Sequence, residues 1–177
     1  MKPPEQFETE RLILRKPCMD DAPILFTAYM QDSEVTRYTI WRPHQYLQEV
    51  EDFIRNCISA WEKEVRFPCV ITLKGHEEPF GMIDFHITGC TVGFGYVIAC
   101  SHQRKGYATE ATRAVIDWAF KQPSIYRVNA STDVENLASA RVMEKVGMQR
   151  EGLLRKYTVH PNISDEPRDS YMYAIVK

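Results

Sequence analysis

Apolar residues recur every three or four positions in several stretches of the chain, which is the spacing of α-helices with one buried face. Helices are expected over residues 23–30, 45–63, 107–121 and 136–146. Asp20 or Asp21 stands where it can cap the first helix, which Pro23 opens. Gly147 stands where a helix commonly ends in a left-handed residue, so it is expected to stop the last one.

Other stretches alternate apolar and polar residues or form short apolar runs, which predicts strands. Strands are expected over residues 8–15, 66–73, 80–87, 91–100, 126–132, 153–159 and 170–176. Residues 74–79 and 88–90 have the composition of hairpin turns, so the strands that they join should be antiparallel. The strand–helix–strand unit over 91–132 needs a crossover, which joins parallel strands. The predicted class is therefore α/β, with a mixed, mostly antiparallel sheet.

Length and composition favour a single domain over residues 1–177, with its core from about residue 7. No repeat, low-complexity tract or Gly/Ser-rich linker divides the 177 residues. Lys and Arg total 22 against 24 Asp and Glu, for a net charge of −2. A protein that binds nucleic acid through phosphate contacts usually carries a basic excess, so nucleic acid is not an expected partner.

The five cysteines are widely spaced and include no C-x-x-C pair, which argues against a disulfide framework and against a zinc site. No metal is expected. The first ten residues, MKPPEQFETE, lack the apolar stretch of a signal peptide, and no run approaches the roughly 20 apolar residues of a membrane span. The expected location is the cytoplasm, away from membranes.

The segment 101–111 (SHQRKGYATEA) is the strongest candidate for chemistry, because a strand ends, a basic turn follows and a helix begins at once. Free amides at a helix start, together with the helix dipole, form an anion site. Gly106 permits close approach of a phosphate, and Arg104 and Lys105 add charge. The alternative is a surface loop with two solvated cations. The segment matches neither the P-loop nor the dinucleotide-binding pattern.

Gln103-x-x-Gly106-x-Ala108 resembles the Q/R-x-x-G-x-G/A pyrophosphate loop of the GNAT superfamily of N-acetyltransferases. The stretch 105–111 is similar to the RimJ/RimL-type branch, which acetylates the N-termini of ribosomal proteins. Residues 8–15 (ETERLILR), 136–148 (N-x-x-S…K-x-G-M) and 168–174 (RDSYMYA) resemble other segments of that branch, with Met148 in place of the usual Phe. The resemblance covers residues 7 to 177 in the expected order.

The resemblance implies the GNAT acyl-CoA N-acyltransferase fold, with two splayed parallel strands, and acetyl-CoA as cosubstrate. Loop amides would hold the pyrophosphate, the pantetheine arm would lie between the splayed strands, and an N–H near Val97 or Ile98 would polarise the thioester carbonyl. The implied coenzyme-binding residues are Val97, Ile98, Ala99, Gln103, Arg104, Lys105, Gly106, Tyr107, Ala108, Thr109, Asn129, Asn136 and Ser139.

Ser139 is the candidate general acid for the leaving thiolate. It shares a helix side with Asn136 and continues into an apolar stripe, where a hydroxyl needs a partner. The alternative is a core serine bonded to a carbonyl of its own helix. Asn136 is also placed to cap that helix, and it can do both.

No residue is an obvious candidate for the general base. Many relatives carry a Glu on the strand before the loop, and the alignment places Gly93 there. Asp84 and His86 lie two residues apart, hence on one face of the neighbouring strand, and either could accept a proton. Alternatively, both simply face solvent.

A weak base favours an acceptor amine that is already partly neutral. An α-amine is neutral in roughly a tenth of molecules at pH 7, a lysine amine in about one in thousands. The sequence therefore favours a protein or peptide N-terminus, attacking directly in a ternary complex. An alternative acceptor is a small amine (an antibiotic, a polyamine or an amino acid), contacted by residues of the 17–62 region. The candidate contacts there are Tyr38, Trp41, Arg42, Tyr46 and Trp61.

The absence of a Glu at position 93 also leaves open a catalytically weak acetyl-CoA sensor or interaction module. The oligomeric state is open as well, with a homodimer as one alternative.

Overall fold

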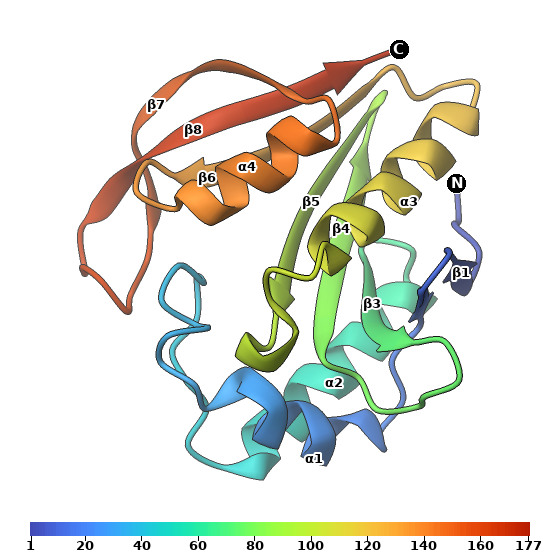
Figure 1. Ribbon diagram of the computed structural model, residues 1–177, viewed down its shortest axis with the longest axis vertical. Coiled ribbons are helices and arrows are strands. Elements are labelled where there is room, and N and C mark those ends of the chain that lie inside the picture. Colours follow the sequence, from blue (N-terminus) through green and yellow to red (C-terminus); the bar gives the residue numbers. More distant parts are fainter.

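The computed structural model describes residues 1–177, folded around one eight-stranded sheet in the order β1-β2-β3-β4-β5-β6-β8-β7 (Figure 1). The strands are β1 (Gln6–Glu8), β2 (Leu12–Arg15), β3 (Phe67–Leu73), β4 (Gly81–Thr88), β5 (Thr91–Ile98), β6 (Arg127–Asp133), β7 (Gln149–Val159) and β8 (Pro167–Val176). The α-helices are α1 (Asp21–Leu25), α2 (Leu47–Glu62), α3 (Tyr107–Lys121) and α4 (Leu137–Lys145). None of these helices is both long and apolar enough to cross a membrane.

The sheet is mixed, as predicted. Both hairpins, β3–β4 and β4–β5, are antiparallel, and β5 and β6 form the parallel pair that the crossover through α3 requires. All other neighbouring strands pair antiparallel. The predicted α/β class with one parallel strand–helix–strand unit is therefore confirmed.

The parallel pair is short, and this creates the main irregularity of the sheet. β5 and β6 pair only over three positions, ending at Gly93 and Asn129. Beyond these residues β6 keeps its pairing with β8 as far as Asp133, while β5 continues to Ile98. Figure 1 shows the two strands meeting at one end and diverging at the other. The splay that the resemblance implied is present.

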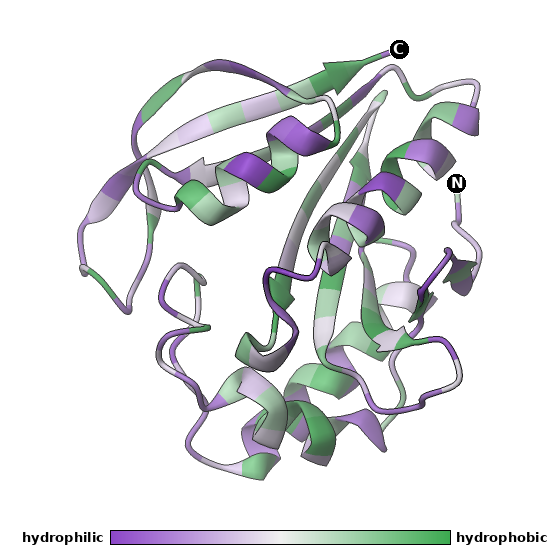
Figure 2. Ribbon diagram, viewed as in Figure 1, coloured by the Kyte–Doolittle hydropathy of each residue, from purple (hydrophilic) through white to green (hydrophobic).

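Helices cover both faces of the sheet and pack on its central strands. Trp118 of α3 packs on Phe85 of β4, with ring centroids 5.5 Å apart. On α2, Trp61 is fully buried and donates from its indole nitrogen to the Pro68 carbonyl of β3. The buried positions of α2 follow the predicted helical spacing. Figure 2 shows the mainly hydrophobic strands β3 and β4 beside the hydrophilic segment that leads into α3.

The first predicted strand, 8–15, was wrong as one element, because the chain reverses within it. The Thr9 hydroxyl accepts from the Leu12 amide at 2.9 Å, and the Thr9 amide donates to the Leu12 carbonyl. This tight turn separates β1 from β2 and pairs them antiparallel. Side-chain bonding of this local kind leaves no trace in the alternation of apolar residues.

The first helix also departs from the prediction. It begins at Asp21 rather than at Pro23, and its last five residues, Phe26–Met30, form a π-helical turn. Asp20 occupies the N-cap position, as one of the two predicted alternatives, but its side chain makes no capping hydrogen bond. The Asp21 carboxylate pairs with Arg15 at 2.7 Å and accepts from the Cys18 amide. The acidic side chain thus ties the helix to β2.

Two strand ends were also misplaced. β5 stops at Ile98 instead of 100, because residues 100–102 turn as a 3-10 helix. β7 begins at Gln149, four residues before the predicted start at 153. This strand is an almost fully exposed edge strand with two bulges, so its sequence shows little alternation.

Candidate active site

A cleft of about 620 Å³ opens where β5 and β6 diverge, between the start of α3 and α4. Ten of the thirteen residues implied for coenzyme binding line it. They are Val97, Ile98, Gln103, Arg104, Gly106, Tyr107, Ala108, Thr109, Asn136 and Ser139. The other three, Ala99, Lys105 and Asn129, do not line it. Ala99 is buried and its amide is bonded to the Phe80 carbonyl, and Asn129 lies at the apex where the strands part.

The loop between β5 and α3 has amides that find no acceptor within the protein. Arg104 and Gly106 have positive φ values of 61° and 84°, and Gly106 is the N-terminal cap of α3, with no side-chain cap. None of the amides from residue 104 to 109 donates to a protein acceptor; the first bond of the helix runs from Glu110 to Gly106. Free amides that converge at a helix start suit a phosphate group.

Basic side chains surround the same end of the cleft. Arg104 belongs to the loop, while Arg141 and Lys145 come from α4. The two α4 residues were missed as binding residues, although their i, i+4 spacing on the predicted helix 136–146 was a usable signal. Together with the α3 dipole they make this end favourable for a polyanion.

The free edge of β5 directs alternate backbone groups into the cleft. In an antiparallel pair, alternate residues bond to the same neighbour, and the Ala99 amide donates to Phe80 beside β4. Ile98 therefore points its N–H and C=O toward the splay, and Val97 points toward β4. The Gln103 side-chain amide donates to the Ile98 carbonyl at 3.0 Å, which leaves the Ile98 N–H as the free group.

A hydroxyl pair faces the cleft from opposite walls. The Tyr96 hydroxyl of β5 donates to the Ser139 hydroxyl of α4 at 3.3 Å, which is the partner that the sequence required for Ser139. Burial raises the pKa of Tyr96 to about 12, against the opposing effect of the Ser139 bond, so the phenol keeps its proton at neutral pH. Asn136 caps α4, since its side chain accepts from the Ser139 amide. Sequence reasoning missed Tyr96, because its partner lies 43 residues away.

Neither candidate base, Asp84 nor His86, lines the cleft. His86 is exposed and its ring lies over Gly93: a Cβ on Gly93 would meet the ring at 2.5 Å and the Asn129 side-chain oxygen at 3.4 Å. A glutamate at position 93 could not be built without moving His86. The histidine ring thus occupies the space that the Cβ of any other residue at position 93 would need.

Asp84 lies on the same strand face, near α2. One carboxylate oxygen is 3.0 Å from the Arg66 guanidinium, and the other is enclosed without a hydrogen-bond donor. Burial raises the pKa of Asp84 to about 6, and Arg66 only partly offsets this. Burial, with Asp84 nearby, raises the pKa of Cys57 in α2 to about 12. The Asp84 carboxyl can therefore titrate near neutral pH, but it is paired with Arg66 and lies outside the cleft.

The segment between α1 and α2 forms the remaining wall of the cleft, through Glu34, Val35, Tyr38 and Thr39. A side chain from the β7–β8 turn stabilises this segment. The side-chain amide of Asn162 donates to the Thr36 and Trp41 carbonyls at 2.6 and 2.8 Å.

Of the aromatic and cationic residues expected to contact an acceptor, only Tyr38 reaches the cleft. Trp61 belongs to the core, Tyr46 is exposed, Trp41 stacks on His44, and Arg42 pairs with Asp165.

The raised pKa of Asp84 predicts a measurable pH dependence of stability. A carboxyl with a higher pKa in the folded protein contributes stability at low pH, which is lost as pH rises from about 4 to about 6. Asp84→Asn removes this component, so the free energy of unfolding of the variant relative to wild type should rise across that window. Urea unfolding at pH 4, 5, 6 and 7 measures it. If the difference in the free energy of unfolding between variant and wild type stays constant or falls from pH 4 to pH 6, the raised pKa of Asp84 is contradicted.

Comparison with known proteins agrees with this geometry. Residues 11–149 match the family model described as an acetyltransferase (GNAT) domain. An uncharacterized N-acetyltransferase, p20 of Bacillus licheniformis, is 32% identical over 98% of this chain and 97% of its own. A GNAT-family acetyltransferase structure from Bacillus anthracis is 32% identical, with a TM-score of 0.84, over 97% of this chain and 98% of that one.

A structure of RimL, described as a ribosomal L7/L12 α-N-protein acetyltransferase in complex with coenzyme A, superposes with a TM-score of 0.85 over 97% of this chain and 98% of that one. At 18% identity this likeness shows the shared fold. The family match, the full-length relative and the splayed sheet agree. The chain belongs to the GNAT family of acetyltransferases and is an acetyl-CoA-dependent acyltransferase.

Proposed function

We propose that this protein acetylates the α-amine of a protein or peptide N-terminus, by direct attack of the amine in a ternary complex with acetyl-CoA. The observation that carries the proposal is the cleft itself, which combines free loop amides and a hydroxyl pair but holds neither Asp84 nor His86.

The residues at the basic end of the cleft fit a coenzyme with a diphosphate. The free amides of residues 104–109 would hold the diphosphate oxygens, and Arg104, Arg141 and Lys145 would balance the phosphate charge. When bound, acetyl-CoA supplies an acetyl group activated as a thioester. The pantetheine arm would bond to the free edge of β5 as an added strand does.

Two features of the cleft would lower the barrier to transfer. The free N–H of Ile98 would stabilise negative charge on the carbonyl oxygen, as a preorganised donor in a site shielded from water. Ser139 would donate its proton to the departing sulfur while the Tyr96 hydroxyl donates to Ser139, and the proton that the amine loses as the amide forms would restore the hydroxyl pair, so that the pair keeps no net charge.

The α-amine preference follows from the missing base. His86 lies on Gly93 at the apex, outside the cleft, and Asp84 is held by Arg66. An enzyme without a strong base in reach works more easily with an amine that is partly neutral at pH 7, as an α-amine is. The description of RimL as an α-N-protein acetyltransferase supports the same choice.

A panel of acceptors tests this proposal through thiol release from acetyl-CoA. Peptides with a free α-amine should react, while the same peptides with an acetylated N-terminus and an internal lysine should not. Faster turnover of a polyamine, an amino acid or an aminoglycoside would favour the small-amine alternative. Binding of acetyl-CoA without turnover of any amine would favour a sensor.

Gly106→Glu should abolish coenzyme A binding. The new Cβ would lie 3.3 Å from Arg11 Nη2, at a backbone φ of 84° that L residues rarely adopt, so the loop would have to shift, and the new carboxylate would add negative charge beside it. Gly75→Glu is a matched control, because Gly75 has a φ of 79° with open space around it, in the β3–β4 turn. Calorimetry with coenzyme A should give no heat for the first variant and wild-type heat for the second. Equal affinities would contradict the role of the loop.

Ser139→Ala should lower kcat by about 10²-fold and leave the coenzyme A Kd nearly unchanged, because general acid catalysis is lost while binding groups stay. Tyr96→Phe should show a smaller loss, since Ser139 keeps its own proton to give. Steady-state kinetics and calorimetry separate these effects. A kcat for Ser139→Ala equal to that of wild type would remove the serine from the mechanism.

A further inference from the structure

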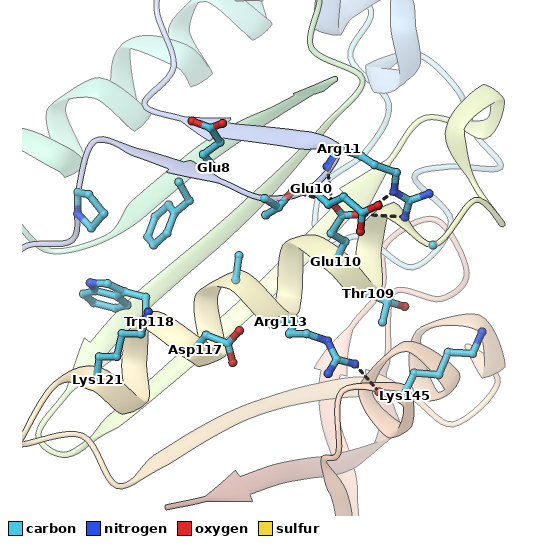
Figure 3. A pocket seen from close by; sticks show the side chains of 15 residues that line it. Glu8, Glu10, Arg11, Thr109, Glu110, Arg113, Asp117, Trp118, Lys121 and Lys145 are labelled. Atoms are coloured by element: carbon cyan, nitrogen blue, oxygen red, sulfur yellow. Dashed lines mark hydrogen bonds and ion pairs between the residues drawn. The ribbon is translucent and has the colours of Figure 1, made fainter. Parts of the chain in front are cut away.

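A second cavity, of about 750 Å³, lies between the β1–β2 turn and α3 (Figure 3). It borders the loop of residues 104–109, called the coenzyme loop from here on. It shares Gly106, Thr109 and Lys145 with the cleft, so one short stretch of backbone separates the two spaces. The side chains at this boundary come from segments about 100 residues apart in the sequence. Contacts that fix the position of this boundary also fix the position of the loop amides.

Glu110, in the first turn of α3, is the centre of the contact. One of its oxygens accepts from the Thr9 hydroxyl at 2.6 Å and from the Arg11 amide at 2.9 Å, and the other accepts from Arg11 Nε at 2.7 Å (Figure 3). Burial acts to raise the pKa of Glu110, but these bonds together hold it below its usual value. The carboxylate is therefore ionised at neutral pH and anchors α3 to the β1–β2 turn.

Arg11 extends from this anchor to the loop itself. Its Nη1 donates to the Lys105 carbonyl at 3.1 Å, and its guanidinium lies 4.8 Å from the centroid of the Tyr107 ring. Its Nη2 would be 3.3 Å from a Cβ on Gly106. One side chain thus contacts three successive loop residues on the side opposite the coenzyme cleft.

The loop needs such a contact because of its conformation. Arg104 has a φ of 61° without being glycine, and Gly106 has a φ of 84°. Residues in sparsely populated conformations cost free energy and persist only where the surroundings hold them. The Lys105 carbonyl, between the two, has Arg11 as its hydrogen-bond donor.

We propose that Arg11, oriented by Glu110 and Thr9, is a positioning residue that keeps the amides of residues 104–109 aimed at the diphosphate of the coenzyme. This proposal rests on the proposed function, because it concerns the same loop. Arg11 touches neither reacting atom. Through its contacts with the loop, Arg11 affects the affinity of the protein for the coenzyme. It also connects the β1–β2 turn to the coenzyme-binding residues.

Glu110→Gln distinguishes this role from simple electrostatics. Removing a negative charge near the loop should strengthen binding of a polyanion if charge alone matters. If the carboxylate orients Arg11, the same change should weaken coenzyme A binding, by about tenfold. Arg11→Lys keeps the charge but loses the forked contact, and should show a similar loss.

The test measures the coenzyme A Kd by calorimetry and the steady-state constants with acetyl-CoA and with S-acetylpantetheine, which lacks the diphosphate. The variants are Glu110→Gln, Arg11→Lys and Thr9→Val, with Arg127→Lys as control. Arg127 forms a forked pair with Glu151 at the paired end of β6, away from the loop. Thermal unfolding shows that each variant is folded.

We expect the three variants to raise the coenzyme A Kd and the KM for acetyl-CoA about tenfold, with kcat and the rate with S-acetylpantetheine near wild type. The control should match wild type throughout. An unchanged or tighter Kd in both Glu110→Gln and Arg11→Lys would overturn the proposal, as would an equal loss with S-acetylpantetheine. A wild-type protein that gives no heat with coenzyme A would overturn the proposed function as well.

Discussion

The parting of β5 from β6 after three residue pairs is the constraint on which the site depends. Backbone groups along a strand edge need partners. In the diverging half β5 still pairs with β4 and β6 with β8, so the two edges that face each other are left without a neighbouring strand. Ile98 thus keeps an N–H free beside the cleft. The same divergence makes room for α4 to bring Ser139 within 3.3 Å of Tyr96. The end of pairing between β5 and β6 therefore accounts both for the free edge of β5 and for the Tyr96–Ser139 hydroxyl pair.

The start of α3 adds a second set of free amides at the end of that edge. Two residues with positive φ turn the chain so that no amide between positions 104 and 109 is used internally. Such a loop is costly to hold, and the contacts that hold it come from the β1–β2 turn on its far side. Hydrogen bonds thus join the ETERLILR segment to the coenzyme loop and α3, although three strands, β3, β4 and β5, lie between β2 and β6 in the sheet.

Much of the fold and part of the candidate site could be predicted from the sequence, because these features depend on local patterns of residues. The helical spacing of α2 and α3 and the hairpin turns predicted the mixed sheet, which is confirmed, and the strand–loop–helix order around Gly106 led to the anion site that we propose. The features that escaped prediction depend on partners far apart in the chain. Tyr96 with Ser139, Arg11 with Glu110, and His86 over Gly93 are set by strand register and helix packing, which spacing alone does not encode. The break at Thr9 was missed because a single hydroxyl makes the turn.

The proposed function depends on main-chain amides at the start of α3 that would hold the coenzyme diphosphate. A titration of the ¹H–¹⁵N amide spectrum with coenzyme A tests it most directly, with the resonances of Gly106, Tyr107 and Ala108 assigned. We expect these amides to show the largest shifts and to saturate together, with a smaller shift of the Ile98 amide caused by the pantetheine arm. Saturable binding that leaves the three loop amides unmoved would contradict it.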